Sequence, residues 1–174
     1  MDFQDVNGRG SQTRNRNSAK YSLDSLVKRS YSALTLILIR GRVAEGKKLQ
    51  RGLIRDIRRA IVVNRPDARL WCLLGDQYKS TAKQEQCFRQ ALRITPKDPE
   101  ANAEMAYICA CQGDRARFRR HYDRALASSR GFDIEDFVIY IAFDAAKEAA
   151  DTRRAKRAMA LGRRRFPKNT LFQP

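Results

Sequence analysis

A chain of 174 residues is long enough to form one domain with a sizeable core. Hydrophobic residues make up 43% of it, which excludes a wholly disordered polyelectrolyte. The 36 basic residues outnumber the 19 acidic ones and give a net charge of +17. Such a balance favours an acidic partner, which is a nucleic acid, an anionic membrane or an acidic protein.

Residues 1–21 are predicted to be a disordered basic tail. Asn, Ser, Gly and Arg dominate this stretch, and Phe3 and Val6 are its only sizeable apolar residues beyond Met1. It cannot bury enough surface to offset the loss of chain entropy. It also lacks the apolar core of a secretory signal, so we do not expect it to be one.

Residues 22–66 are predicted to form N-terminal helices. The apolar run from Leu34 to Ile39 is far shorter than the roughly 20 residues that span a bilayer. We therefore expect a buried part of a first helix, from about Leu23 to Val43, and no transmembrane segment. A second helix follows, with Ile57 and Ala60 on its buried side.

Residues 67–167 carry the most informative pattern, which is a motif of widely spaced large and small residues. The spacing is W-x2-L-G-x2-Y followed by F-x2-A-x4-P, and its members are Trp71, Leu74, Gly75, Tyr78, Phe88, Ala91 and Pro96. The first three large residues share one helical stripe, on which Gly75 lets a second helix approach closely. Pro96 ends that second helix, because proline has no N–H to donate. We expect Trp71 to be a core residue.

This motif resembles the opening of a tetratricopeptide repeat (TPR), and the pattern recurs. Phe88, Tyr122 and Met159 lie 34 to 37 residues apart, which is the TPR period. The resemblance runs from Tyr31 to Pro167. It implies an all-α, right-handed solenoid of three full repeats, with residues 22–66 as a degenerate repeat and 168–174 as a C-terminal tail.

Basic residues recur at equivalent places of the second helices. In register, they would form a basic band: Arg55, Arg59, Lys83, Arg117, Arg120, Arg124, Arg154 and Arg157. The resemblance places second helices on the convex surface. Arginine binds phosphate in a bidentate manner, so the band predicts phosphate contacts, and the simpler alternative is a solvated helix face.

The first helices of the repeats carry a different set of residues. The resemblance implies that they line a concave groove, whose candidate partner-binding residues are Arg69, Asp76, Lys79, Glu104, Tyr107, Phe137, Tyr140, Asp144, Lys147 and Glu148. Some TPR proteins bind a chaperone's C-terminal carboxylate through basic groove residues. Cys72, Asp76 and Glu104 occupy those places here, so we reject that subtype.

Catalytic and metal-binding patterns are not found in the sequence. There is no Gly-rich phosphate loop, and the four cysteines include no C-x2-C pair. His121 is the single histidine, and nothing in the sequence pairs a nucleophile with it. We therefore expect a non-enzyme without metal or cofactor, and buried thiols of a reducing compartment, the cytoplasm.

The sequence thus predicts an adaptor that binds a peptide or helix of a protein partner in its groove. Two alternatives stay open, namely an RNA- or ribosome-associated protein that uses the basic band and tail, and a peripheral adaptor on an anionic membrane. We also expect partly exposed apolar residues on the C-terminal helix, which would support a homo-oligomer: Ala155, Ala158, Met159 and Phe166.

Overall fold

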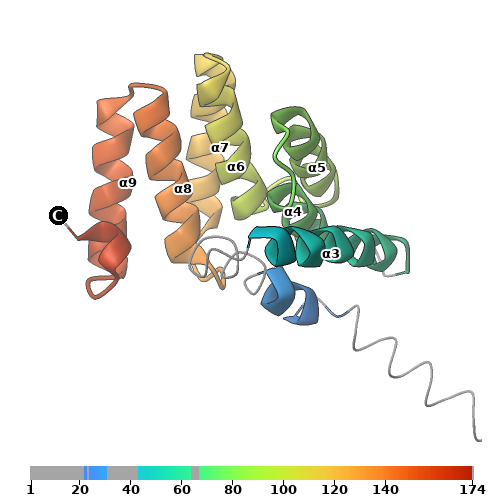
Figure 1. The fold of residues 1–174 in the computed structure, drawn as a ribbon. Helices are drawn as coiled ribbons and strands as arrows, with labels where there is room; N and C mark the ends of the chain where they lie inside the picture. Colours follow the sequence, from blue (N-terminus) through green and yellow to red (C-terminus); the bar gives the residue numbers. More distant parts are fainter. Residues whose placement is uncertain (1–21, 23, 31–42, 64–66, 174) are drawn as a thin grey trace, which may run out of the picture. The chain divides into compact units, whose positions relative to one another are not determined.

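The computed structural model describes residues 22, 24–30, 43–63 and 67–173 (Figure 1). Every regular element among them is helical and none is a strand, which confirms the all-α class. The predicted tail, the apolar run from Leu34 to Ile39 and the outermost repeat residues Tyr31 and Pro66 lie outside the described residues. None of the described helices is both long and apolar enough to cross a bilayer. The chain divides into two compact units, Met1–Gln77 and Tyr78–Pro174.

The first unit contains a helical segment at 24–30, α3 (Val43–Val63) and α4 (Ala68–Asp76). The first helix was predicted to end at Val43, but α3 begins there. Ile57 and Ala60 are fully buried, as their places in the pattern require. A carboxylate on α3 also pairs with the 24–30 segment, because Asp56 Oδ2 lies 2.7 Å from Nη2 of Arg29.

Trp71 is half-buried, whereas the pattern predicted a core residue. The fully buried positions of α4 are its neighbours, including Cys72 and Leu74. The predicted pairing of α4 with α5 would join two separate units, so it stays a prediction.

The second unit is a run of consecutive helices, α5 (Thr81–Ile94), α6 (Pro99–Cys111), α7 (Arg115–Ser128), α8 (Glu135–Glu148) and α9 (Thr152–Arg165), closed by the short 3-10 helix η1 (Thr170–Phe172). Each α-helix packs on the next, and α6 also packs on α8 (Figure 1). Small residues permit this close approach, because Ala103 and Ala106 of α6 and Ala142 and Ala145 of α8 are fully buried.

Aspartates fix where three of these helices begin. Asp98, Asp114 and Asp151 each precede a helix and accept a hydrogen bond from a backbone N–H three residues later, at 2.8, 2.9 and 3.1 Å. Such caps satisfy donors that the first helical turn leaves unpaired. The sequence therefore encodes the starts of α6, α7 and α9 locally.

The predicted repeat register matches the observed helices. α5, α7 and α9 are each 14 residues long, and Phe88, Tyr122 and Met159 are the eighth residue of their helices. Phe88 and Tyr122 are buried, and Met159 is half-buried. The sequence period thus identified structurally equivalent places on successive second helices.

The C-terminal segment differs from its prediction as a tail. η1 brings Phe172 into full burial against Gly162 of α9, where an added Cβ would lie 2.3 Å from the phenyl ring. Phe172 also stacks on Phe166, and its carbonyl accepts a hydrogen bond from Arg163 Nε at 2.8 Å. The segment therefore covers the end of α9.

This packing corrects part of the expectation of partly exposed apolar residues on the C-terminal helix. Ala158 is fully buried and Ala155 is nearly so. Only Met159 and Phe166 of the predicted set are half-buried. The surface available for the predicted self-association is smaller than the sequence suggested.

Candidate functional site

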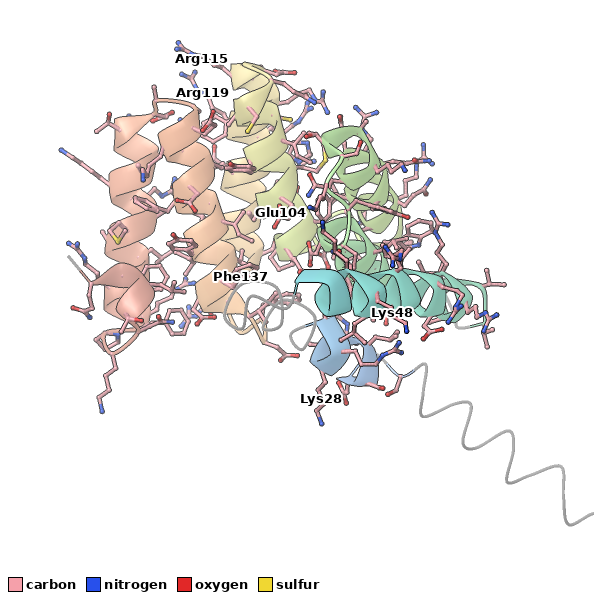
Figure 2. The ribbon with its side chains drawn as sticks, in the orientation of Figure 1. Lys28, Lys48, Glu104, Arg115, Arg119 and Phe137 are labelled. Carbon is pink, nitrogen blue, oxygen red and sulfur yellow. The ribbon has the colours of Figure 1, made fainter. Side chains whose placement is uncertain are left out.

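A stripe of aromatic and acidic side chains crosses two packed helices, and we call it the α6/α8 face. Glu104 and Tyr107 lie on α6 at helical spacing, and the residues at helical spacing on α8 are Phe137, Tyr140, Asp144 and Glu148. Figure 2 labels Glu104 and Phe137. Tyr107 is 39% exposed and Phe137 is 44% exposed. Large apolar side chains are usually more buried than this, so the face offers contact area to a partner.

The charged and buried groups of this face shift the pKa of Tyr107 and of Asp144. The pKa of Tyr107 is raised above its ordinary value by the Cys111 thiol, by burial, and by the carboxylates of Glu148 and Asp144. Burial raises the pKa of Asp144, although Lys147 and a hydrogen bond from Tyr140 oppose the effect. Tyr107 of α6 therefore shares one negatively charged neighbourhood with Asp144 and Glu148 of α8.

The remaining predicted groove residues lie beside or outside this stripe. Lys147 Nζ lies over the ring of Phe143, 5.4 Å from its centroid. Lys79 is exposed in the segment before α5. Arg69 and Asp76 lie on α4 in the other unit, and Arg69 pairs with Asp67 at 3.7 Å. Their place in a common groove stays a prediction.

The predicted basic band contains two kinds of side chain. Six are exposed, namely Arg55, Arg59, Lys83, Arg120, Arg124 and Arg157. The other two, Arg117 and Arg154, are half-buried. Arg55 and Arg59 belong to α3 in the first unit.

Arg117 and Arg154 join consecutive second helices. Arg154 contacts Asp151 at 3.0 Å and reaches back to Asp123 of α7 at 3.2 Å, and its guanidinium lies over the ring of Tyr122. Arg117 occupies the same place in α7 and reaches back to Glu85 of α5 at 3.3 Å. Both side chains are thus used within the fold, which the repeat pattern alone did not indicate.

Four arginines line a shallow cavity of about 380 Å³ between α5 and α7, which is open to solvent. Its lining consists of Arg89, Leu92, Arg93, Met105, Arg117, Arg120 and His121. Arg89, Arg93 and His121 were not among the predicted site residues. A signal for the first two was available, because Arg89 and Arg93 are four residues apart and therefore share one face of α5.

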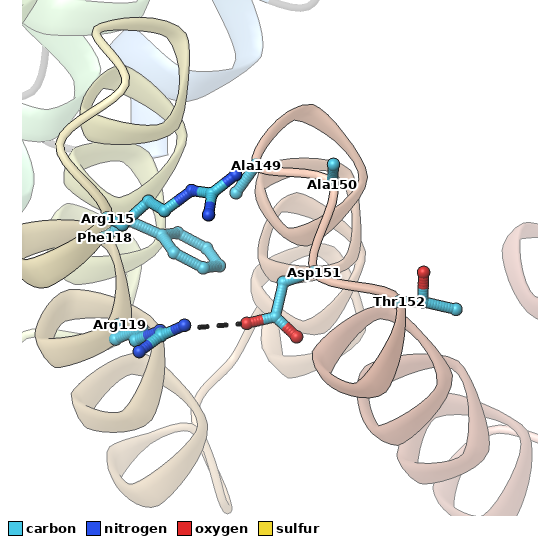
Figure 3. Close-up of a pocket in the computed structure, with 7 residues that line it drawn as sticks. All are labelled: Arg115, Phe118, Arg119, Ala149, Ala150, Asp151 and Thr152. Atoms are coloured by element: carbon cyan, nitrogen blue, oxygen red, sulfur yellow. Dashed lines mark ion pairs between the residues drawn. The ribbon is translucent and has the colours of Figure 1, made fainter.

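A smaller cavity of about 240 Å³ lies between α7 and the turn that links α8 to α9. Figure 3 shows Arg115 and Arg119 extending from α7 toward this turn. Arg119 Nε lies 4.0 Å from Asp151 Oδ2, and Arg154 holds the same carboxylate more closely, at 3.0 Å. The backbone N–H and guanidinium of Arg154 keep the pKa of Asp151 below its ordinary value, although burial opposes this. The residues here hold the turn in place.

The cysteines differ in their access to solvent. All four are free thiols, and Cys72, Cys87 and Cys109 are buried. Burial raises the pKa of the Cys109 thiol. Cys111 is exposed and lies one helical turn from Tyr107, at the end of α6.

Comparison with known proteins adds no assignment to this geometry. The chain matches no known family profile, and no curated protein matches it.

Proposed function

We propose that this protein is a non-enzymatic, TPR-like adaptor that binds a segment of a protein partner through the α6/α8 face. The observation that supports it is the pair of exposed aromatic rings, Tyr107 and Phe137, on two helices packed against each other. Aromatic side chains of this kind dominate the energetics of protein interfaces. The free thiols suit a reducing compartment such as the cytoplasm.

The charge of the face indicates the chemistry of the partner. Glu104, Asp144 and Glu148 accompany the aromatic rings, and Lys147 is the nearby counter-charge. A segment with apolar side chains and at least one Lys or Arg complements this surface. Electrostatic complementarity selects such a partner over an acidic one.

Peptide display on the intact protein tests this proposal. We expect selection for peptides that combine apolar and basic residues. The double variant Tyr107→Ala, Phe137→Ala should weaken their binding at least about tenfold, because exposed interface aromatics are frequent hot spots. The variant Arg120→Gln, Arg124→Gln is the control and should bind them as the parent does. Equal binding by the aromatic double variant would refute the proposal.

A second candidate function is RNA binding by the second helices. It is favoured by Arg120 and Arg124, which are exposed and have no carboxylate partner within the described part of the chain. Arg157 continues the surface, although it pairs with Asp123 at 3.6 Å. Binding to RNA should weaken steeply with salt as counterions compete for phosphate.

A triple variant tests the second candidate. Arg120→Gln, Arg124→Gln, Arg157→Gln should reduce the salt slope by about 3, because three phosphates of the RNA are then no longer neutralised. Arg117 is left in place because it pairs with Glu85 and Asp114. An unchanged slope would identify a solvated face, and co-sedimentation with anionic vesicles but not RNA would favour the membrane alternative.

A further inference from the structure

The cavity between α5 and α7 concentrates positive charge. Guanidinium groups come from Arg89 and Arg93 on α5 and from Arg117 and Arg120 on α7, and Met105 of α6 contributes an apolar side chain. The hollow, of about 380 Å³, is wide open to solvent, so a small anion there would remain partly exposed. Four arginines around one hollow repel each other unless an anion neutralises them.

One carboxylate holds two of these arginines in position. Glu85 Oε1 lies 2.6 Å from Arg89 and 3.3 Å from Arg117, and its second oxygen accepts a hydrogen bond from Gln112 at 3.1 Å. The same contacts keep the pKa of Glu85 below its ordinary value, although burial opposes them. Glu85 is thus committed to orienting the cavity wall, and it leaves a net positive charge.

The other two arginines are available to a ligand. Arg93 and Arg120 are exposed, and neither has a carboxylate partner among the residues that the structure describes. They come from different helices and line the same hollow. Arginine forks of this kind bind phosphate oxygens in a bidentate manner.

His121 adds a responsive group to the cavity. Its Nδ1 lies 3.0 Å from Asn102 Oδ1, and the Asn102 amide nitrogen donates to the carbonyls of Pro96 and Asp98. Asn102 Oδ1 must therefore accept, so Nδ1 carries the proton and Nε2 is left with a lone pair. Burial and then Arg120, Arg117, Arg124 and Arg89 lower the pKa of His121 to about 4.

We propose that this cavity binds a phosphate group, with Arg93 and Arg120 as the main contacts and His121 beside them. The site is on the side of the second helices, so it does not depend on protein binding by the α6/α8 face. The phosphate belongs either to a small molecule or to an RNA backbone, and only in the latter case does the site rest on the second candidate function. A bound phosphate anion would offset part of the arginine charge that, together with burial, lowers the pKa of His121.

The lone histidine provides a direct measurement, since the chain contains one His. Inorganic phosphate is titrated into the full chain and the Cε1–H resonance of His121 is followed by NMR. Sodium chloride at equal ionic strength is the reference. We expect a saturable shift in phosphate alone, together with a rise of the His121 pKa above about 4. The same response in both salts would overturn the proposal.

Two matched double variants locate the site. Arg93→Gln, Arg120→Gln should weaken phosphate binding at least about tenfold, as expected for the loss of charge-assisted hydrogen bonds. Arg153→Gln, Arg164→Gln removes equal charge from exposed positions of α9 outside the cavity lining and should have a small effect. Equal weakening by both variants would refute a specific site. Circular dichroism checks that both retain the parental fold.

Single-stranded RNA separates the two sources of phosphate. If the group belongs to RNA, inorganic phosphate competes with RNA and the cavity variant loses affinity for both. If it belongs to a small molecule, RNA does not displace inorganic phosphate, and the single variant Arg93→Gln loses phosphate affinity while it retains whatever RNA affinity the parent has. Phosphate binding without any RNA binding would reject the second candidate function and keep this site.

Discussion

The α6–α7 pair and the α8–α9 pair share several features, but their second helices pack against different neighbours. In both pairs the second helix has 14 residues, an aspartate cap and an arginine at its third position. α7 packs against helices on both sides in the chain, α6 and α8. α9 packs mainly against α8 and contacts α7 through the side chain of Arg154, and η1 packs against it from the other direction along the chain. The difference shows that a short 3-10 helix packs against α9, whereas α7 packs between two longer helices.

Three equivalent places carry different residues in the two pairs. The left-handed turn residue is Gly113 in one pair and Ala150 in the other. The seventh residue of the second helix is His121 in α7 and Ala158 in α9, and the eleventh is Ala125 in α7 and Gly162 in α9. Each exchange can be tested by placing the residue of one pair into the other.

The largest expected effect comes from the aromatic cap of α9. Phe172→Ala should lower the free energy of unfolding by about 3–5 kcal/mol, because a fully buried phenyl ring is removed. Leu171→Ala is the control, since Leu171 is 39% exposed, and it should cost far less. Urea unfolding measures both. Equal midpoints for Phe172→Ala and the parent would show that η1 does not stabilise α9.

Gly162, which packs against the Phe172 ring, provides a second test of how α9 differs from α7. Gly162→Ala gives α9 the residue that α7 has, but its Cβ would meet the Phe172 ring at 2.3 Å. We expect it to destabilise the parent, and to stabilise the Phe172→Ala variant by up to about 1 kcal/mol through helix propensity. A double-mutant cycle measures this coupling. Additive effects would contradict direct packing of the two residues.

A pH effect should distinguish α7 from α9. The pKa of His121 is lowered from 6.5 to about 4 in the fold, so the unfolded chain binds the proton first as the pH falls. The stability that depends on neutral His121 is complete above pH 6.5 and is lost toward pH 4. Between pH 7 and pH 5, in buffer without phosphate, the loss should be about 2 kcal/mol.

The matched variant is His121→Ala, which places the α9 residue in α7. It should be less stable at pH 7, because Asn102 loses a hydrogen bond, and its stability should vary little between pH 7 and pH 5. Denaturant unfolding at each pH provides the slope. A parental slope in this variant would assign the pH dependence to other groups.

Arg117 and Arg154, the third residues of α7 and α9, should differ moderately in their contribution to stability. Arg154→Gln should cost about 1–2 kcal/mol, because two carboxylates and the Tyr122 ring contact a side chain that is 24% exposed. Arg117→Gln should cost less than about 1 kcal/mol, since its carboxylate partners are farther away, at 3.3 and 3.8 Å. Thermal unfolding ranks the two variants. The reverse order would mean that the ion-pair distance does not determine their contribution.

The smallest effect belongs to the turns. Ala150 has φ of 52° and Gly113 has φ of 74°, a region that glycine enters without strain. Ala150→Gly should therefore stabilise the protein by up to about 1 kcal/mol, and Gly113→Ala should destabilise it by about 1 kcal/mol. No atom lies within 4 Å of the added Cβ at Gly113, so strain alone is measured. Melting temperatures that shift in the same direction for both variants would contradict this account.

The sequence predicted what is local and periodic. The spacing of Phe88, Tyr122 and Met159 located equivalent places on α5, α7 and α9, because a period depends only on distance along the chain. The packing of Gly162 against Phe172 could not be read in this way. This contact joins α9 to η1, a short segment that repeats no pattern found elsewhere in the chain. A glycine within a helix, taken alone, indicates only a low helix propensity.

The candidate surfaces were predicted in the same uneven manner. The resemblance to TPR proteins placed the residues of the α6/α8 face on the first helices of the repeats, and the structure places them on α6 and α8. The pairing of Arg117 with Glu85, and the approach of His121 to arginines of α5, depend on how two helices pack. The sequence predicted the same role for Arg117 and Arg120. In the structure Arg117 forms an ion pair with Glu85, whereas Arg120 is exposed.

Cys111 is a site at which the α6/α8 face can be labelled chemically. It is the exposed thiol among four, so a maleimide reagent should modify it before the buried three. A fluorophore attached there would stand one helical turn from Tyr107. Its emission would report the arrival of a partner segment, and a bound segment would slow the labelling reaction. Labelling at Cys111 therefore allows binding of a partner to this face to be followed over time in solution.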